Sequence, residues 1–375
     1  MPRFIHTADL QIGKMFESLA APSDRLAFLR KARIDVIRRV GKLARERSAS
    51  AVLVAGDVFE RSELRELVLR EALAAMSETE LVWVLLPGNH DPDGASSIWE
   101  RITRIGCPAN VILAREQQPI LLADGALAIV PAPLTRRHQY ADPTSHFDAC
   151  PTPAGAVRVG LAHGSLQNRL APSAETHNMI LDTRAEQAQL DYLALGDWHS
   201  MREIAPRTWY AGTPEADGFD QTSGYVLVVD IAGPKQPPTV EPVRVGEYKW
   251  QRIEAVLHSP DSEVGLRTAL AGIEEPWAKS VVDLRLSGAV SLAERTRIDE
   301  CLADLEARLQ VLRLDTSNLR SLPSETDLDE LGRHGYIADV VQRLRSLSSS
   351  AGDPDSAFAE AALHRLYVEH SIGGK

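Results

Sequence analysis

Carboxylate, amide and imidazole side chains follow five apolar runs of this 375-residue chain, at residues 4–8, 51–55, 81–86, 157–162 and 192–195. Such side chains bind divalent metal ions. Two metal ions about 3.5 to 4 Å apart hydrolyse phosphoesters, because they activate a hydroxide and neutralise the phosphoryl oxygens. The candidate residues, in chain order, are Asp9, Gln11, Asp57, Asn89, His90, Asp91, His163, Asp197 and His199.

The elements around these residues predict a domain in which strands and helices form layers. Each of the apolar runs has the composition of a buried strand. Ser23 is a candidate N-cap for a helix with apolar residues at helical spacing, and residues 64–76 predict a second helix. Alternating strands and helices are typical of an α/β fold. Ligands bind beyond the carboxyl ends of strands in open α/β sheets, so we expect the polar clusters to converge.

A segment rich in glycine and proline, residues 233–238, predicts a domain junction. We expect a first domain at residues 1–232, a small α/β capping domain at 239–320 and a helical segment at 325–375. In the capping domain the pattern predicts helices at 262–271 and 292–309, and strands at 239–244, 250–256, 280–286 and 311–315. The last segment contains two helical patterns, 337–344 and 358–366.

Composition limits the possible functions. A hydrophobic fraction of 44% is ordinary for a well-packed soluble protein. No signal peptide and no apolar run of about 18 to 20 residues is recognisable, so we expect a cytoplasmic protein without a membrane span. The three cysteines show no paired spacing. A net charge of −11 counts against a broad surface that coats nucleic acid, but not against a nuclease whose metal ions supply positive charge locally.

The ordered set of motifs resembles the metallophosphoesterase signature of the calcineurin-like superfamily. The stretches 6–9 (HTAD), 56–59 (GDVF), 87–91 (PGNHD) and 212–215 (GTPE) resemble those of SbcD-type DNA repair exonuclease subunits. The resemblance covers the first two hundred and some residues well, and the rest only by layout. It implies a two-sheet β-sandwich flanked by helices, with a capping domain and C-terminal helices. It also implies DNA as the substrate, and an SMC-like coiled-coil ABC ATPase (SbcC-type) that binds the C-terminal helices.

The resemblance also assigns roles to the candidate residues. Asp57 would bridge two metal ions. Asp9, Gln11 and His199 would bind the first ion, and Asn89, His163 and Asp197 the second. His90 would donate a hydrogen bond or proton toward the leaving oxygen, and Asp91 would orient His90.

Two positions depart from the family pattern, in which Gln11 and Asp197 are normally histidines. Both changes replace a nitrogen ligand by an oxygen ligand, which favours manganese or magnesium over zinc. We therefore expect manganese-dependent activity. The departures also keep open a non-catalytic scaffold with a degenerate site.

The residues are also compatible with a different substrate and with different uses of the surface. The chain could be a phosphodiesterase or phosphatase that acts on small nucleotides or phosphoproteins, for which a capping domain would be unusual. A basic run on the first long helix could contact DNA or form a solvated face. Trp198 could line the substrate cleft or pack in the interior. Helices of the first domain could form a homodimer, although no interface signal is visible.

Overall fold

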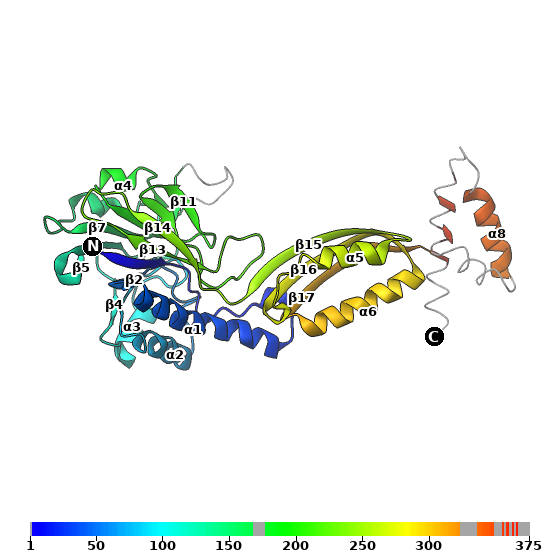
Figure 1. Ribbon diagram of the computed structural model, residues 1–375, viewed down its shortest axis with the longest axis horizontal. Coiled ribbons are helices and arrows are strands. Elements are labelled where there is room, and N and C mark those ends of the chain that lie inside the picture. The colour runs from blue at the N-terminus through cyan, green and yellow to red at the C-terminus, as the bar shows by residue number, and fades with distance from the viewer. Residues whose placement is uncertain are drawn as a thin grey trace. The chain divides into compact units, whose positions relative to one another are not determined.

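The computed structural model describes residues 2–167, 177–322 and 336–348, with a few positions between 355 and 366. Contacts divide the chain into two compact units, Met1–Trp250 and Gln251–Lys375 (Figure 1). No helix within the described ranges is both long enough and apolar enough to cross a membrane.

The first unit contains two six-stranded sheets. The first sheet has the order β14-β13-β1-β2-β3-β4, in which β1 to β4 are parallel and β13 and β14 are antiparallel to their neighbours. The strands are β1 (Arg3–Thr7), β2 (Ala51–Val54), β3 (Val82–Leu85), β4 (Val111–Leu113), β13 (Tyr225–Asp230) and β14 (Thr239–Arg244). The helices that follow β1, β2 and β3 are α1 (Ser23–Glu46), α2 (Glu66–Ser77) and α3 (Ile98–Ile105) (Figure 1).

The second sheet has the order β11-β12-β10-β7-β6-β5. Its strands are β5 (Ile120–Leu122), β6 (Leu127–Ala132), β7 (Val157–His163), β10 (Tyr192–Gly196), β11 (Arg202–Ala205) and β12 (Thr208–Tyr210). Three short elements fall between β7 and β10 along the chain. They are the paired strands β8 (Ser165–Leu166) and β9 (Met179–Ile180) and the helix α4 (Arg184–Gln187).

Alternation along the strands explains the layers. In β1, Phe4 packs with Leu161 and Tyr192 of the second sheet, whereas its neighbour Ile5 packs with Val36 and Ile37 of α1. Successive side chains of a strand point to opposite faces, so one face of the first sheet meets the second sheet and the other meets the helices. The predicted β-sandwich flanked by helices is confirmed.

The strand predicted at 239–244 forms, but it belongs to the first unit. As β14 it pairs with β13 over six residues, from Tyr225 opposite Arg244 to Asp230 opposite Thr239. A hairpin across residues 231–238 joins the two strands, so the predicted junction is a turn within the first sheet. The contact boundary instead follows Trp250.

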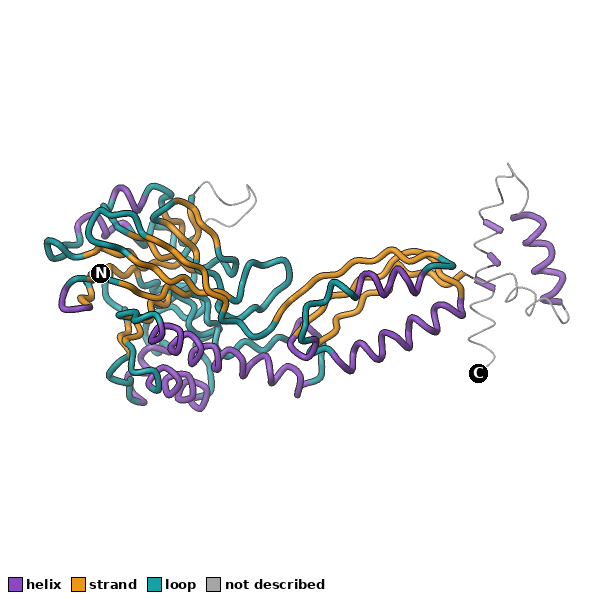
Figure 2. Tube along the Cα trace, viewed as in Figure 1, coloured by secondary structure: helices purple, strands orange, loops and turns teal. Residues whose placement is uncertain are grey.

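The second unit contains the remaining predicted elements of the capping domain. Its sheet has the order β15-β16-β17, with β15 (Lys249–His258), β16 (Ser280–Ser291) and β17 (Val311–Leu322). The helices α5 (Ser262–Leu270) and α6 (Leu292–Arg308) pack on this sheet, and Figure 2 shows α6 running along the strands. Ser291 begins α6 in a capping box with Glu294.

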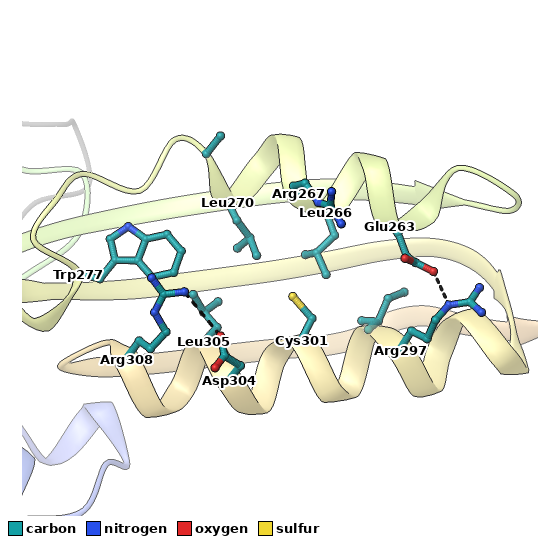
Figure 3. A pocket seen from close by; sticks show the side chains of 12 residues that line it. Glu263, Leu266, Arg267, Leu270, Trp277, Arg297, Cys301, Asp304, Leu305 and Arg308 are labelled. Atoms are coloured by element: carbon teal, nitrogen blue, oxygen red, sulfur yellow. Dashed lines mark ion pairs between the residues drawn. The ribbon is translucent and has the colours of Figure 1, made fainter.

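A cavity of about 360 Å³ lies between α5 and α6. Figure 3 shows Leu266 and Leu270 of α5 facing Leu305 of α6 across it. Ion pairs lie at its two ends, Glu263 with Arg297 and Asp304 with Arg308. The cavity is therefore a gap in the helix layer of this unit.

The helix predicted at 337–344 is present as α8 (Tyr336–Ser348). Its Val341 packs with Leu363 from the second predicted pattern. Most of that second pattern, 358–366, and the start of the expected segment at 325 lie outside the described residues.

Asp283 of β16 is expected to make the second unit sensitive to acid. Hydrogen bonds from Arg313 at 2.7 Å and Arg252 at 2.9 Å lower the pKa of the Asp283 carboxyl to about 2. The unfolded value is about 3.9, so this stabilisation is complete above that pH and is lost as the pH falls toward 2. Asp283→Asn should weaken the pH dependence of urea unfolding between about pH 4 and 2. Asp299→Asn, whose carboxylate is 53% exposed, is the control and should leave that dependence unchanged.

Candidate metal centre

The predicted site residues meet where strands of both sheets end. Asp9 and Gln11 follow β1, Asp57 follows β2, and Asn89 to Asp91 follow β3. His163 is the last residue of β7, and Asp197 and His199 follow β10. These strands are parallel within each sheet, so their carboxyl ends lie at one edge of that sheet.

Sharp backbone turns occur at four of the candidate residues at this edge. Asp9, Gln11, Asp57 and Asp197 have φ values of 51°, 45°, 50° and 105°, all in the left-handed region. Residues other than glycine adopt this region at an energetic cost, and such residues cluster at functional sites. The turns therefore bring together side chains that straight strands would keep apart.

Asp9, Asp57 and His163 form the centre of the site. Each residue offers one ligand atom, and these three atoms lie within 4.8 Å of one another. All three side chains are buried. The Oδ1 atom of Asp9 is buried without a hydrogen-bond partner. Because an unpaired buried carboxylate oxygen is costly, this arrangement fits a bound cation. The donor set suits a divalent metal ion.

His163 presents one ring nitrogen to the cluster. Its Nδ1 lies 2.8 Å from the carbonyl oxygen of Ala55, which favours a proton on Nδ1 and leaves Nε2 for a ligand. Nε2 lies 3.4 Å from Asp57 Oδ1 and 3.3 Å from Asn89 Oδ1. A Cβ atom at Gly56 would collide with the His163 ring, so this close approach needs glycine.

Asp197 and Asn89 extend the cluster on the His163 side. Asp197 Oδ1 lies 3.8 Å from His163 Nε2 and 3.4 Å from Asn89 Nδ2. Ser165 Oγ donates a hydrogen bond of 2.7 Å to Asp197 Oδ2, and the Asp197 main-chain N–H donates to Asp9 Oδ2 at 3.3 Å. The carboxylate that replaces a histidine here thus lies within the cluster.

Gln11 lies on the other side of Asp57. Its Nε2 donates to Asp57 Oδ2 at 3.3 Å, and its Oε1 accepts from Lys14 Nζ at 3.2 Å. The amide group is therefore held between a carboxylate and an ammonium group.

His199 is held by Asp217, a residue that the sequence analysis did not identify. Asp217 Oδ1 lies 2.9 Å from His199 Nδ1, and its Oδ2 pairs with Arg33 at 2.9 Å and Lys14 at 2.8 Å. Asp217 follows no apolar run, and its only signal is a position two residues after the GTPE stretch. By holding Nδ1, Asp217 leaves the His199 Nε2 atom to act as a ligand.

The predicted role of Asp91 in orienting His90 is wrong. Asp91 is fully buried, and its oxygens accept hydrogen bonds from the main-chain N–H groups of Gly88 at 2.7 Å and Phe59 at 2.9 Å. The His90 ring is instead held by the carbonyl oxygen of Glu60, 3.1 Å from its Nδ1. Asp91 therefore shapes the loop that carries His90.

The carboxylates differ in their ionisation. Burial raises the pKa of Asp9 to about 7. Burial also raises the pKa of Asp57, but the charge and hydrogen bond of His163 outweigh it and bring the pKa to about 2. An anionic Asp9 thus needs more positive charge than its protein neighbours supply, and a divalent cation would provide it.

The structure shows the contacts of Trp198 and of three arginines in the basic run at the end of α1. Trp198 stacks on Tyr210, with ring centroids 4.9 Å apart, and joins the apolar cluster on the second sheet. Within the basic run, Arg38 of α1 pairs with Glu78, Arg39 of α1 with Glu215, and Arg47, the residue after the helix, with Glu241. These arginines are neutralised within the chain.

The comparison with protein-family models identifies the class of this chain. The sequence model of the calcineurin-like phosphoesterase family matches residues 2–233. The chain belongs to this family, and the family together with the candidate centre indicates a metal-binding phosphoester hydrolase. A search of curated proteins finds no match.

Solved structures that are similar to this chain include two that it matches over nearly their whole length. One is TT1561 of Thermus thermophilus, at 11% identity and a TM-score of 0.41, over 65% of this chain and 99% of that one. The second matches at 12% identity and a TM-score of 0.41, over 64% of this chain and 99% of its own.

Proposed function

We propose that this chain is a manganese-dependent DNA nuclease of the SbcD type, which hydrolyses phosphodiesters as an exonuclease and endonuclease in DNA repair. The proposal is carried by the buried cluster of Asp9, Asp57 and His163, with His90 at its edge. The motif resemblance of residues 6–9 and 212–215 supports the narrower assignment to DNA.

Seven residues are proposed to hold two divalent ions, manganese or magnesium. Asp57 lies between the two groups and is the proposed bridge. When bound, such ions activate a hydroxide and neutralise the phosphoryl oxygens. One ion is assigned to Asp9, Gln11 and His199, and the other to Asn89, His163 and Asp197.

His90 is the proposed proton donor to the leaving oxygen. Its side chain is 29% exposed, and its Nε2 lies 4.0 Å from Asp57 Oδ2. Because Glu60 holds Nδ1, Nε2 is the nitrogen free to face a substrate. Proton donation by a positioned side chain contributes about 10²- to 10⁴-fold to the rate.

The proposed partner is an SMC-like coiled-coil ABC ATPase that binds the C-terminal helices. The described part of that segment is α8, whose Ile337, Val341 and Leu344 pack with Leu363 and Leu366, so the rest of the helix surface, where Tyr336 is 83% exposed, would face the partner. An amphipathic helix suits the groove of a helical partner.

Gln11 favours one alternative, a non-catalytic scaffold. Its Oε1, the atom that would bind a metal ion, accepts a hydrogen bond from Lys14. Metal analysis after dialysis against manganese separates the two functions, because a scaffold with a degenerate site should retain less than one ion per chain.

Digestion assays test the proposed nuclease. With manganese, the protein should cleave linear duplex, hairpin or single-stranded DNA faster than a cyclic dinucleotide. His90→Ala should reduce cleavage by about 10²-fold or more and leave the metal content unchanged. Chelation by EDTA should abolish cleavage. Higher activity with zinc than with manganese would refute the choice of metal, and preference for the cyclic dinucleotide would refute DNA as the substrate.

A further inference from the structure

A cavity of about 370 Å³ opens beside His90 in the first unit. His90 forms part of its wall, so the cavity adjoins the candidate metal centre. The loops after β1, β2, β3 and β6 contribute to it. Besides His90, its lining includes Lys14, Met15, Glu17, Glu60, Arg61 and Arg137.

Two arginines at this cavity are available to an anion. Arg61 and Arg137 are exposed, and neither has an ion-pair partner among the described residues. They come from two loops that are far apart in the sequence, and both line this cavity. Unpaired arginines bind phosphate oxygens through charge-assisted hydrogen bonds. Lys14, the third cation, is already paired with Asp217.

The remaining groups in the cavity suit more than a bare phosphate. Glu60 Oε2 is buried without a hydrogen-bond partner, so it can accept a hydrogen bond from an amino or hydroxyl group. Met15, 37% exposed, supplies an apolar surface. Glu17 and Glu60 add negative charge, which disfavours a free polyphosphate. A nucleotide matches this combination, because its phosphate suits the arginines, its amino or hydroxyl groups suit Glu60, and its base or sugar suits the apolar surface.

We propose that this cavity binds the nucleotide next to the scissile phosphate, with Arg61 and Arg137 on that nucleotide's phosphate. The inference rests on the proposed nuclease function and identifies the part of the site that separates polynucleotides from isolated phosphodiesters. A substrate with a single phosphate has no group to place there.

Arg61→Ala/Arg137→Ala tests this subsite. With manganese, the double variant should have a KM for single-stranded oligothymidylate about tenfold or more above that of the unaltered protein, because charge-assisted hydrogen bonds are lost. The kcat and KM for bis(p-nitrophenyl) phosphate should stay within about twofold of the unaltered values, because this substrate has no second phosphate for the two arginines to bind. The slope of log KM for the oligonucleotide against log salt should fall by about 0.7 for one lost phosphate contact.

Arg136→Ala is the matched control, since Arg136 is exposed next to Arg137 but does not line the cavity. Equal losses on both substrates, an unchanged KM for the oligonucleotide, or an equal effect of Arg136→Ala would each overturn the proposal. If the unaltered protein hydrolyses neither substrate, the proposed nuclease fails. Equilibrium binding of the same oligonucleotide then decides the subsite: weaker binding by the double variant supports it, and equal or absent binding overturns it.

Discussion

Asp57→Asn is expected to reduce phosphodiester hydrolysis by about 10³-fold or more, because metal ions supply several kcal/mol of transition-state stabilisation. Asp57 is 2% exposed and contacts both halves of the centre. Its Oδ2 accepts from Gln11 at 3.3 Å, and its Oδ1 lies 3.4 Å from His163 Nε2 and accepts from the His90 main-chain N–H at 2.9 Å. Asparagine removes the negative charge and one acceptor at this central position.

The rate with manganese and the metal content per chain should fall together in this variant. Asp191→Asn is a matched control, because Asp191 is 4% exposed and lies at the opposite end of β10, where it accepts a hydrogen bond from the Arg158 main-chain N–H at 2.8 Å. The control should keep both the rate and the metal content. A rate for Asp57→Asn within tenfold of that of the unaltered protein would contradict a bridging role.

Asp217→Leu is expected to destabilise the first unit by about 3 to 5 kcal/mol, the cost of leaving a buried charge without its partner. Asp217 and Arg33 are each 1% exposed and lie 2.9 Å apart. Burial raises the pKa of Asp217, but Arg33, His199 and Lys14 outweigh it and hold the pKa far below the usual range. The carboxylate is therefore ionised at neutral pH, and its loss leaves Arg33 uncompensated.

A double variant separates this pair from general damage. Asp217→Leu/Arg33→Met removes both charges, so it should cost less free energy of unfolding than Asp217→Leu alone. Urea unfolding with EDTA present measures this without a contribution from metal binding. Asp35→Leu, at a half-buried position of α1 whose carboxylate pairs with Lys31 and Arg38 at the surface, should change stability by less than about 1 kcal/mol. An Asp217→Leu effect as small as this, or a double variant less stable than the single one, would contradict the prediction.

The elements of the first unit could be predicted because each signal is local. The apolar runs that became β1, β2 and β3 alternate with helical patterns, and a polar residue after each strand marks the carboxyl edge. Parallel strands bring those edges together in any such sheet, so Asp9 and Asp57 could be expected to meet without knowledge of the loops. His163, at the end of β7, follows the same rule in the second sheet.

Local patterns therefore predict which strands end in ligand-type side chains, and they predict that these ends converge. Three contacts became visible only in the folded chain: β14 pairs with β13, Asp217 holds His199, and Glu60 rather than Asp91 holds His90. The physical reason is that these contacts join residues far apart in the sequence. Burial periodicity can be recognised among neighbouring residues. These contacts instead depend on loop turns and on pairings between segments whose local patterns carry no information about each other.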